Sequence, residues 1–325
     1  MTIPNRPRYA ARLNAFKPMA GDLGGGIAGM IAAAGQVGGL DTADLNYPDH
    51  FDGQTPETLG AVLGDAGMTL NGVAMRYYTE PGFMIGAFTN PDADVRQKAV
   101  DLTKRGMDAC RAMGGTVITL WMGQDGFDYA FQGEYGRMWD DTIAAMQAVA
   151  DHDPGLDVAI EYKPNEPRAY ALMPDVGTTL LGVREADRSN LGVTLDFAHV
   201  LYADEMPAHA AHLIARHSRL LGVHLNDGYG KRDDGLMVGT VHPVATIELF
   251  VELERIGYDG AIYFDTFPDH GGLNPVEEAR TNLTLVERLR ALAGEIGALP
   301  ELRDAIARQD GAASQRIVAR ALYGA

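Results

Sequence analysis

The chain reads VAIEYKPNEPR from Val158 to Arg168, an apolar run followed directly by charged residues. The apolar part predicts a buried strand. Glu161 and Lys163 are two residues apart, so on a strand both side chains point to the same face. Burying such a pair costs free energy unless each charge has a partner or a metal ion. The stretch indicates a functional site at the end of a core strand, and a plain strand-end ion pair is the alternative.

Similar short apolar runs recur along the whole chain, and amphipathic stretches separate them. Alternating strands and helices predict parallel pairing, and eight such units close into an α/β (β/α)8 TIM barrel. A doubly wound open sheet is the alternative, but Gly24-Gly25-Gly26 does not match the G-x-G-x-x-G phosphate fingerprint. The expected strands are 9–16, 39–46, 71–76, 115–121, 157–162, 191–196, 220–225 and 260–264, and the expected helices include 94–113, 138–150, 206–217 and 243–256.

The chain shows no interdomain linker. Residues 1–300 are expected to form the barrel, and residues 301–325 a short C-terminal helical extension that packs on the barrel or on another subunit.

Ligand-type side chains follow four consecutive expected strands. In barrels of this kind the active site lies at the C-terminal ends of the strands. A single residue of this kind at a strand end is usually a helix cap or a solvated loop residue. Four at consecutive strand ends do not fit that explanation, so together they predict a site for a divalent ion. Carboxylates with one imidazole and no thiolate favour Mg²⁺, Mn²⁺ or Co²⁺. The four residues are Glu161, Asp196, His224 and Asp265.

A second ion is expected beside the first. His199 follows Asp196 by three residues, and Asp233 and Asp234 lie in the loop after the seventh expected strand. Two ions bridged by Asp196 would clamp both oxygens of a diol.

Composition excludes several classes of partner. The formal net charge of −17 argues against nucleic acid, whose phosphates attract basic patches. Cys110 is the only cysteine, so no disulfide framework is expected and a reducing cytoplasm is the default. The first residues lack the apolar core of a signal peptide, and no run approaches the ~20 apolar residues of a membrane span.

The motifs resemble those of the sugar isomerases in the xylose isomerase-like barrel superfamily, over roughly residues 44–280. Glu161–Arg168 matches the family signature nearly residue for residue. Gly86–Thr89 matches a second family segment, and Trp121–Gly126 looks like the family's Trp-Gly-Gly-Arg-Glu-Gly. Asp196 and His199 parallel the family's acid-x-x-His pair.

Two departures from the family pattern bear on the substrate and the second metal. His224 stands where xylose isomerases carry aspartate, whereas rhamnose isomerases of the superfamily carry histidine. The second-metal loop normally reads Asp-x-Asp followed by Leu. Here Gly235 precedes Leu236, so Asp233 takes the first ligand position and the second is left without a carboxylate unless Asp234 substitutes.

The resemblance implies aldose–ketose isomerisation by a hydride shift from C2 to C1, with two divalent cations. Lys163 would donate to O1 and stabilise its negative charge. Trp121 and Phe88 would form the apolar wall beside the sugar. His50, which titrates near neutrality in its ordinary state, would open the sugar ring. The implied substrate is a pentose, a deoxyhexose or a branched aldose, and relatives assemble as homo-oligomers, either dimers or tetramers.

Rival functions share the barrel. A ketose 3-epimerase would use two acids on opposite faces of C3 with one metal, a chemistry that does not need Lys163. A metal-dependent dehydratase of keto-inositols is a second rival. An endonuclease acting on abasic DNA conflicts with the acidic charge. A sugar-binding barrel without catalysis would typically lose a metal ligand, and only the Gly235 position looks lost.

Overall fold

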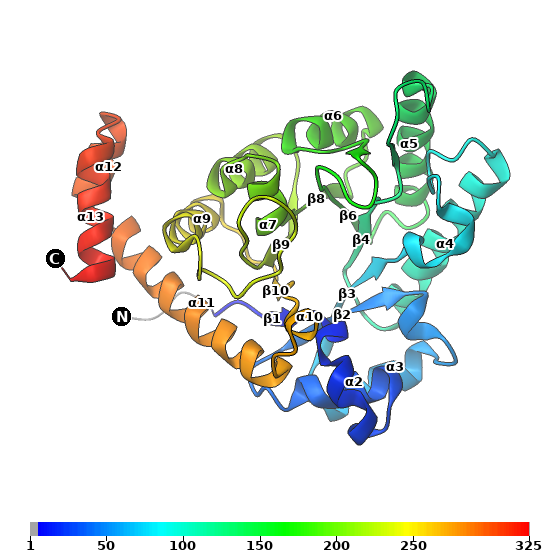
Figure 1. Cartoon of the computed structure of the whole chain (residues 1–325), viewed down its shortest axis with the longest axis horizontal. Helices are drawn as coiled ribbons and strands as arrows, with labels where there is room; N and C mark the ends of the chain where they lie inside the picture. The colour runs from blue at the N-terminus through cyan, green and yellow to red at the C-terminus, as the bar shows by residue number, and fades with distance from the viewer. Residues whose placement is uncertain (1–5, 325) are drawn as a thin grey trace.

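The computed structural model describes residues 6–324 and contains an eight-stranded parallel sheet in the order β1-β10-β9-β8-β6-β4-β3-β2. Helices surround the ring of strands (Figure 1). Just ahead of β2, the Asp41 backbone N–H donates to the Tyr9 carbonyl at 2.8 Å and links the two end strands of the order. The sheet is therefore a nearly closed barrel, which confirms the predicted (β/α)8 TIM-barrel class. Its strands are β1 (Tyr9–Ala11), β2 (Thr42–Tyr47), β3 (Thr69–Met75), β4 (Val117–Trp121), β6 (Asp157–Glu161), β8 (Leu191–Asp196), β9 (Leu220–Leu225) and β10 (Ile262–Phe264).

The barrel strands form where apolar residues run without interruption. Every residue of β8 is buried, and Val158 to Ile160 of β6 are fully buried. Strands of a parallel sheet are covered on both faces, so they show continuous apolar runs rather than alternation. This is why the sequence pattern located the strands closely.

The helices follow the expected amphipathic stretches. The α9 helix has the bounds expected for it, 243–256, and its Pro243 occupies the first turn, where a missing N–H costs nothing. Asp92 caps α4, its Oδ1 accepting from the Asp94 N–H at 2.9 Å. The helices of the barrel and its loops are α1 (Lys17–Ala20), α2 (Gly26–Gly35), α3 (Pro56–Asp65), α4 (Ala93–Ala112), α5 (Tyr135–Ala150), α6 (Val176–Ala186), α7 (Phe197–Tyr202), α8 (Pro207–His217), α9 (Pro243–Ile256), α10 (Pro268–Gly271) and α11 (Pro275–Gly297). Short 3₁₀ helices cover Leu13–Phe16, Gly21–Leu23, Asp49–Phe51, Tyr77–Thr79 and Pro81–Phe83.

The first strand is shorter than expected. The prediction of a strand over 9–16 is wrong beyond Ala11, because Leu13–Phe16 forms a 3₁₀ helix. Leu13 and Phe16 are three residues apart and both buried. In a 3₁₀ helix, side chains at this spacing lie on the same side, so the turn buries both at once.

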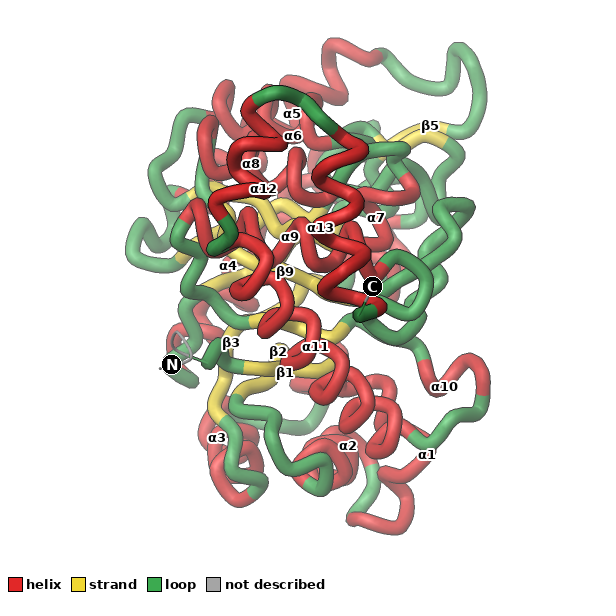
Figure 2. The backbone as a smooth tube through the Cα atoms, turned by 90° about the vertical axis from the view of Figure 1, so that its left-hand side faces the viewer, coloured by secondary structure: helices red, strands yellow, loops and turns green. Residues whose placement is uncertain are grey.

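A two-stranded antiparallel sheet, not expected from the sequence, lies where strands β4 and β6 end. It pairs β5 (Gly126–Phe127) with β7 (Tyr170–Ala171). A Cβ on Gly126 would lie 2.0 Å from the Tyr170 carbonyl oxygen, so this close approach requires glycine. Figure 2 shows β5 and α10 on the same side of the barrel. Because β5 follows the end of β4 and α10 follows the end of β10, this is the side at which the strands end.

The C-terminal residues form two further helices, α12 (Pro300–Ala307) and α13 (Gly311–Tyr323), which pack on each other and on α11. They lie at one edge of the molecule, away from the barrel mouth (Figure 1). The division of the chain at residue 300 stays a prediction. Within residues 6–324, none of the helices has both the length and the apolar character that crossing a membrane requires.

Candidate metal centre and active site

Four ligand-type side chains meet at the C-terminal ends of four adjacent strands. Glu161 ends β6, Asp196 ends β8, His224 lies in β9 and Asp265 follows β10. Each offers one ligand atom, and these atoms all lie within 4.8 Å of one another. The backbone register explains the convergence, because Asp196 pairs with His224 across the sheet. The structure thus brings together the four side chains that the sequence placed at one site.

The charges of this cluster suit a divalent cation. Burial raises the pKa of Asp196 to about 7, and the neighbouring carboxylates add to that rise although His199 opposes it. Burial lowers the pKa of His224, but Glu161 outweighs it and raises the value to about 10. The His224 Nδ1 is buried without a hydrogen-bond partner, 3.4 Å from Glu161 Oε1. The raised pKa values show that protons partly neutralise this cluster of three acids and one imidazole. A divalent cation would replace those protons, and oxygen-rich donor sets fit Mg²⁺, Mn²⁺ or Co²⁺.

Asn226 holds Asp196 in place. Its Nδ2 donates to both Asp196 carboxylate oxygens, at 3.2 and 3.1 Å, and to the Asp265 carbonyl at 3.1 Å. Its Oδ1 accepts from the Ala198 N–H at 2.8 Å. Sequence reasoning did not single out Asn226. The available signal was its spacing, because Asn226 follows His224 by two residues and a strand that continues past Leu225 presents both to one face.

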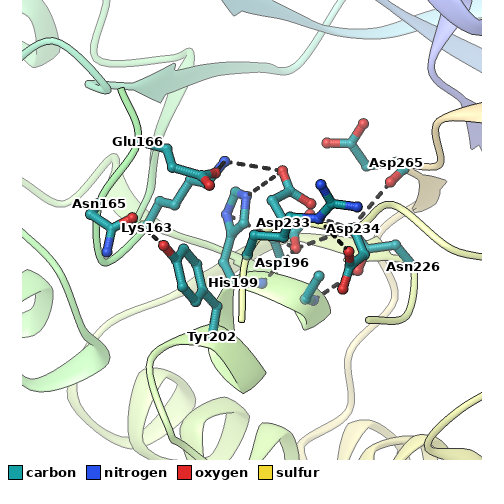
Figure 3. A network of polar contacts seen from close by, with 12 residues as sticks. Lys163, Asn165, Glu166, Asp196, His199, Tyr202, Asn226, Asp233, Asp234 and Asp265 are labelled. Atoms are coloured by element: carbon teal, nitrogen blue, oxygen red, sulfur yellow. Dashed lines mark hydrogen bonds and ion pairs between the residues drawn. The ribbon is translucent and has the colours of Figure 1, made fainter. Parts of the chain in front are cut away.

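A second polar group lies beside the first. Asp233 Oδ2 lies 3.2 Å from His199 Nε2 and accepts from Lys163 Nζ at 3.1 Å, as Figure 3 shows. His199 Nδ1 lies 3.0 Å from the Tyr162 carbonyl, which only an N–H on Nδ1 can satisfy. With Nδ1 held in this way, Nε2 faces Asp233. Burial lowers the pKa of His199, but the surrounding acids outweigh it and raise the value to about 9, so Nε2 carries a proton that a bound cation would replace. The Asp233 Oδ1 atom is buried and has no hydrogen-bond partner.

The structure separates the two adjacent acids of this loop. Asp234 Oδ2 accepts from the Tyr229 N–H at 2.8 Å, and its Oδ1 accepts from Arg232 Nε at 2.7 Å. These contacts hold the loop and engage both carboxylate oxygens of Asp234. Asp233 is therefore the acid that joins His199 and Lys163.

Lys163 keeps its proton at this site. Burial lowers its pKa, but Asp233 and Glu166 outweigh that effect and raise it above the ordinary value. Its Nζ lies 2.9 Å from Glu166 Oε2 and 5.4 Å from the centroid of the Trp121 ring. Lys163 thus presents an ammonium group between two acids and an aromatic face.

A cavity of about 680 Å³ is lined by members of both polar groups, namely Glu161, His224 and Asp265 of the first and Lys163, His199 and Asp233 of the second. Trp121 lines it and pairs with Glu161 across the β4–β6 ladder. Tyr78, which sequence reasoning missed, also lines it, and its ring contacts the Trp121 ring edge-on with centroids 5.3 Å apart. The apolar wall predicted around Trp121 is therefore completed by Tyr78.

Phe88 does not contribute to that wall. It is fully buried, packs edge-on against Tyr77 with ring centroids 5.3 Å apart, and is not among the described residues that line the cavity. Asp125 Oδ1 accepts hydrogen bonds from the backbone N–H groups of Ala87 and Thr89, at 3.0 and 2.7 Å. This clamp fixes the backbone on both sides of Phe88, whose ring then lies in the core.

His50 lies behind the cavity rather than in its wall. It is buried, its Nδ1 accepts from the Asn46 N–H at 3.0 Å, and its Nε2 lies 2.9 Å from Asn14 Oδ1. Burial, with the charges of Arg76 and Arg12, lowers the pKa of His50 to about 3, so the imidazole is neutral. Asn46 lines the cavity, and the described lining residues do not include His50. The role of His50 in ring opening stays a prediction.

Comparison with known proteins agrees with this architecture. The chain is 30% identical over 257 residues to the xylose isomerase of Thermus thermophilus, a match that covers 75% of this chain and 65% of that protein. The chain thus spans less than two thirds of the length of this relative. The solved structure of an L-ribulose 3-epimerase has a TM-score of 0.72 at 15% identity and covers 91% of this chain and 99% of its own.

A second solved structure is a D-allulose 3-epimerase from Methylomonas sp. in complex with D-allulose. It has a TM-score of 0.69 at 18% identity and covers 89% of this chain and 99% of its own. At these identities the two structures establish the fold alone. The sequence profile of the xylose isomerase-like TIM barrel family matches residues 31–289. This chain belongs to the xylose isomerase-like TIM barrel family.

Proposed function

We propose that the protein is a metal-dependent aldose–ketose isomerase that acts on a small-molecule sugar with two divalent cations. The observation that carries the proposal is the position of Lys163, 3.1 Å from Asp233 and in the same cavity as the four-donor cluster. Glu161, Asp196, His224 and Asp265 would hold one ion, and His199 and Asp233 would contribute to a second beside it. Bound cations would polarise the sugar oxygens and lower the pKa of a bound water.

The residues of the chain supply positioning and charge. Lys163 donates a hydrogen bond to O1, where negative charge develops as hydrogen moves from C2 to C1. Asp233 and Glu166 hold the ammonium in place from two sides. Trp121 and Tyr78 present apolar surface that excludes water from the reacting carbons, a condition under which a hydride shift competes with proton exchange.

A ketose 3-epimerase is the second candidate function. The observation that favours it is the presence of two acids, Glu161 from β6 and Asp265 after β10, in one metal cluster. Such a pair can remove a proton from one face of C3 and return it to the other. The solved structures of similar fold include ketose 3-epimerases. A protonated lysine beside a second acid–imidazole pair has no part in that reaction, so we favour the isomerase.

A substrate panel separates the two functions. Purified protein is incubated with aldoses and ketoses in the presence of Mn²⁺, and again after chelation. We expect conversion of an aldose into the corresponding 2-ketose, and loss of that conversion on chelation. Conversion of ketoses only into their C3 epimers would contradict the isomerase and support the epimerase.

The replacement His199→Ala is expected to damage the second ion and turnover more than sugar affinity. His199 Nε2 faces Asp233 and is the only imidazole in the second group among the described residues. We expect turnover to fall at least roughly 10- to 100-fold, the range seen when even the partners of metal ligands are removed. Metal titration and steady-state kinetics measure both effects. The exposed His209 gives a matched control, His209→Ala. Two filled sites with normal turnover in His199→Ala would refute the assignment.

Divalent cations are expected to stabilise the folded protein. A ligand that binds only the native state adds about 2.7 kcal/mol at a concentration 100 times its dissociation constant. For a chain of this size we expect saturating Mn²⁺ to raise the melting temperature by roughly 3–6 °C. Differential scanning calorimetry before and after chelation measures the shift. An unchanged melting temperature at saturating Mn²⁺ and Mg²⁺ would count against a metal centre.

The expected homo-oligomer, a dimer or tetramer, stays a prediction that light scattering during size-exclusion chromatography tests. The expected cytoplasmic location also stays a prediction.

A further inference from the structure

Arg76 lies at the barrel mouth with its side chain against the cavity that holds the metal cluster. It directly follows β3, its backbone N–H donates to the Tyr47 carbonyl at 2.9 Å, and its carbonyl accepts from Thr79 Oγ1 at 2.9 Å. These bonds fix the backbone from which the half-buried side chain extends. Arg76, Tyr78 and Trp121 line the same cavity as Glu161.

The Arg76 guanidinium has no carboxylate partner among residues 6–324 and donates no side-chain hydrogen bond there. Its Nε is buried without an acceptor, and the guanidinium lies over the Tyr78 ring, 5.1 Å from the ring centroid. A buried donor without an acceptor costs free energy, and the cost is greater when the donor belongs to a charged group. A ligand that supplies acceptors removes this cost.

The other arginines of the cavity are already paired. Arg12 donates to Asp269 Oδ1 at 2.8 Å, and Arg232 donates to Asp234 Oδ1 at 2.7 Å. Two acids that line the same cavity are engaged elsewhere, because Asp44 accepts from Asn71 Nδ2 at 2.9 Å and Asp265 belongs to the metal cluster. The cavity thus holds a cluster of acids, which suits cations, and an arginine that has no carboxylate partner among residues 6–324.

The volume of the cavity and the net charge of the protein also support an anionic ligand for Arg76. A cavity of about 680 Å³ lies within the range of drug-sized ligand sites and leaves room for a substituent on a sugar. The chain has a formal net charge of −17, which repels anions in general. An anionic substrate would therefore need a local cation. The planar fork of arginine matches the geometry of carboxylate and phosphate oxygens.

We propose that Arg76 binds an anionic group, a phosphate or a carboxylate, carried by the sugar at the end away from its reacting carbonyl. The inference rests on the proposed function and deepens it, because it makes the substrate a sugar phosphate or a sugar acid rather than a neutral aldose. Arg76 then sets specificity, while Lys163 and the metal cluster carry the chemistry.

Polyols test this binding separately from turnover, because they lack the carbonyl that isomerisation requires. Calorimetry of the Mn²⁺-loaded protein compares sorbitol, sorbitol 6-phosphate and gluconate, and the two anions distinguish phosphate from carboxylate. We expect at least one anion to bind roughly 10- to 100-fold more tightly than sorbitol, as charged hydrogen bonds imply. In Arg76→Gln this preference should disappear while the affinity for sorbitol remains, and Arg76→Lys should restore part of it. Arg232→Gln, at an arginine already paired, should keep the preference.

Three results would overturn the proposal. These are equal binding of sorbitol and both anions by the parent protein, a preference that persists in Arg76→Gln, and no binding of either anion at millimolar concentration. A persistent preference would place the anion on the bound cations instead. Melting curves check that each variant is folded. Failure to isomerise any neutral or anionic aldose would contradict the isomerase alone, since the calorimetric preference does not depend on turnover.

Discussion

Replacement of Glu161 by glutamine is expected to abolish metal binding at the four-donor cluster, and with it all metal-dependent turnover. The glutamine amide keeps the size of the side chain but removes the negative charge that attracts the cation. Glu161 is buried, and its pKa lies below the ordinary value because His224 and His199 outweigh the effect of burial. The carboxylate therefore stays ionised and available as a ligand. Asp265→Asn is expected to act in the same way.

Metal analysis of the purified variants measures the effect directly. We expect the fold to be retained, because the amide keeps the shape of the side chain and Asp265 and Asp196 still face the His224 imidazole. Asp227→Asn is the matched control. Asp227 is fully buried close to the end of β9, but it binds the His242 ring and backbone N–H groups and lies outside the cluster. A full complement of tightly bound ion in Glu161→Gln or Asp265→Asn would refute the ligand assignment.

Replacement of Lys163 by methionine is expected to lower turnover by roughly 10²–10³-fold while metal content stays normal. Methionine keeps most of the bulk of the lysine stem and removes the ammonium. A fixed positive charge stabilises the developing charge on O1 more in the transition state than in the ground state. The loss should therefore appear in kcat rather than in KM.

Isotope transfer gives the second measurement for Lys163. With an aldose that carries deuterium at C2, the parent enzyme should deliver the label to C1 of the ketose, as a hydride shift requires. Glu166→Gln serves as the control, because it removes one partner of the ammonium and leaves the ammonium itself. Complete exchange of the label with water, or undiminished turnover in Lys163→Met, would rule out the hydride shift and favour proton transfer through an enediol.

Local patterns were enough to locate most of the barrel. Parallel strands that are buried on both faces consist of uninterrupted apolar runs. The predicted bounds of β6 and β8 therefore agree with the structure to within one residue. The first strand was overextended because Leu13 and Phe16 are as apolar as strand residues, and only their packing reveals a 3₁₀ turn. The β5–β7 pair was missed because each strand has two residues and its partner is distant in sequence.

The sequence by itself determined that Glu161, Asp196, His224 and Asp265 meet. Parallel strands all end at the same rim of a barrel, so residues at their ends converge whatever the details of the loops. Side-chain direction in the loops depends instead on the path of the loop in space, which residue spacing does not fix. Only the tertiary structure decided that Asp233 rather than Asp234 faces His199, because Tyr229 and Arg232 engage its neighbour.

Three further features, the positions of Phe88 and Tyr78 and the unpaired state of Arg76, were also decided by the tertiary structure. Phe88 lies in the core because the carboxylate of Asp125 fixes the backbone beside it. Tyr78 occupies the position beside Trp121 that was expected for Phe88. Unlike Arg12 and Arg232, Arg76 forms no ion pair with an acid among residues 6–324. Burial and ion pairing of these side chains depend on how the chain folds in space, so they cannot be predicted from the local sequence.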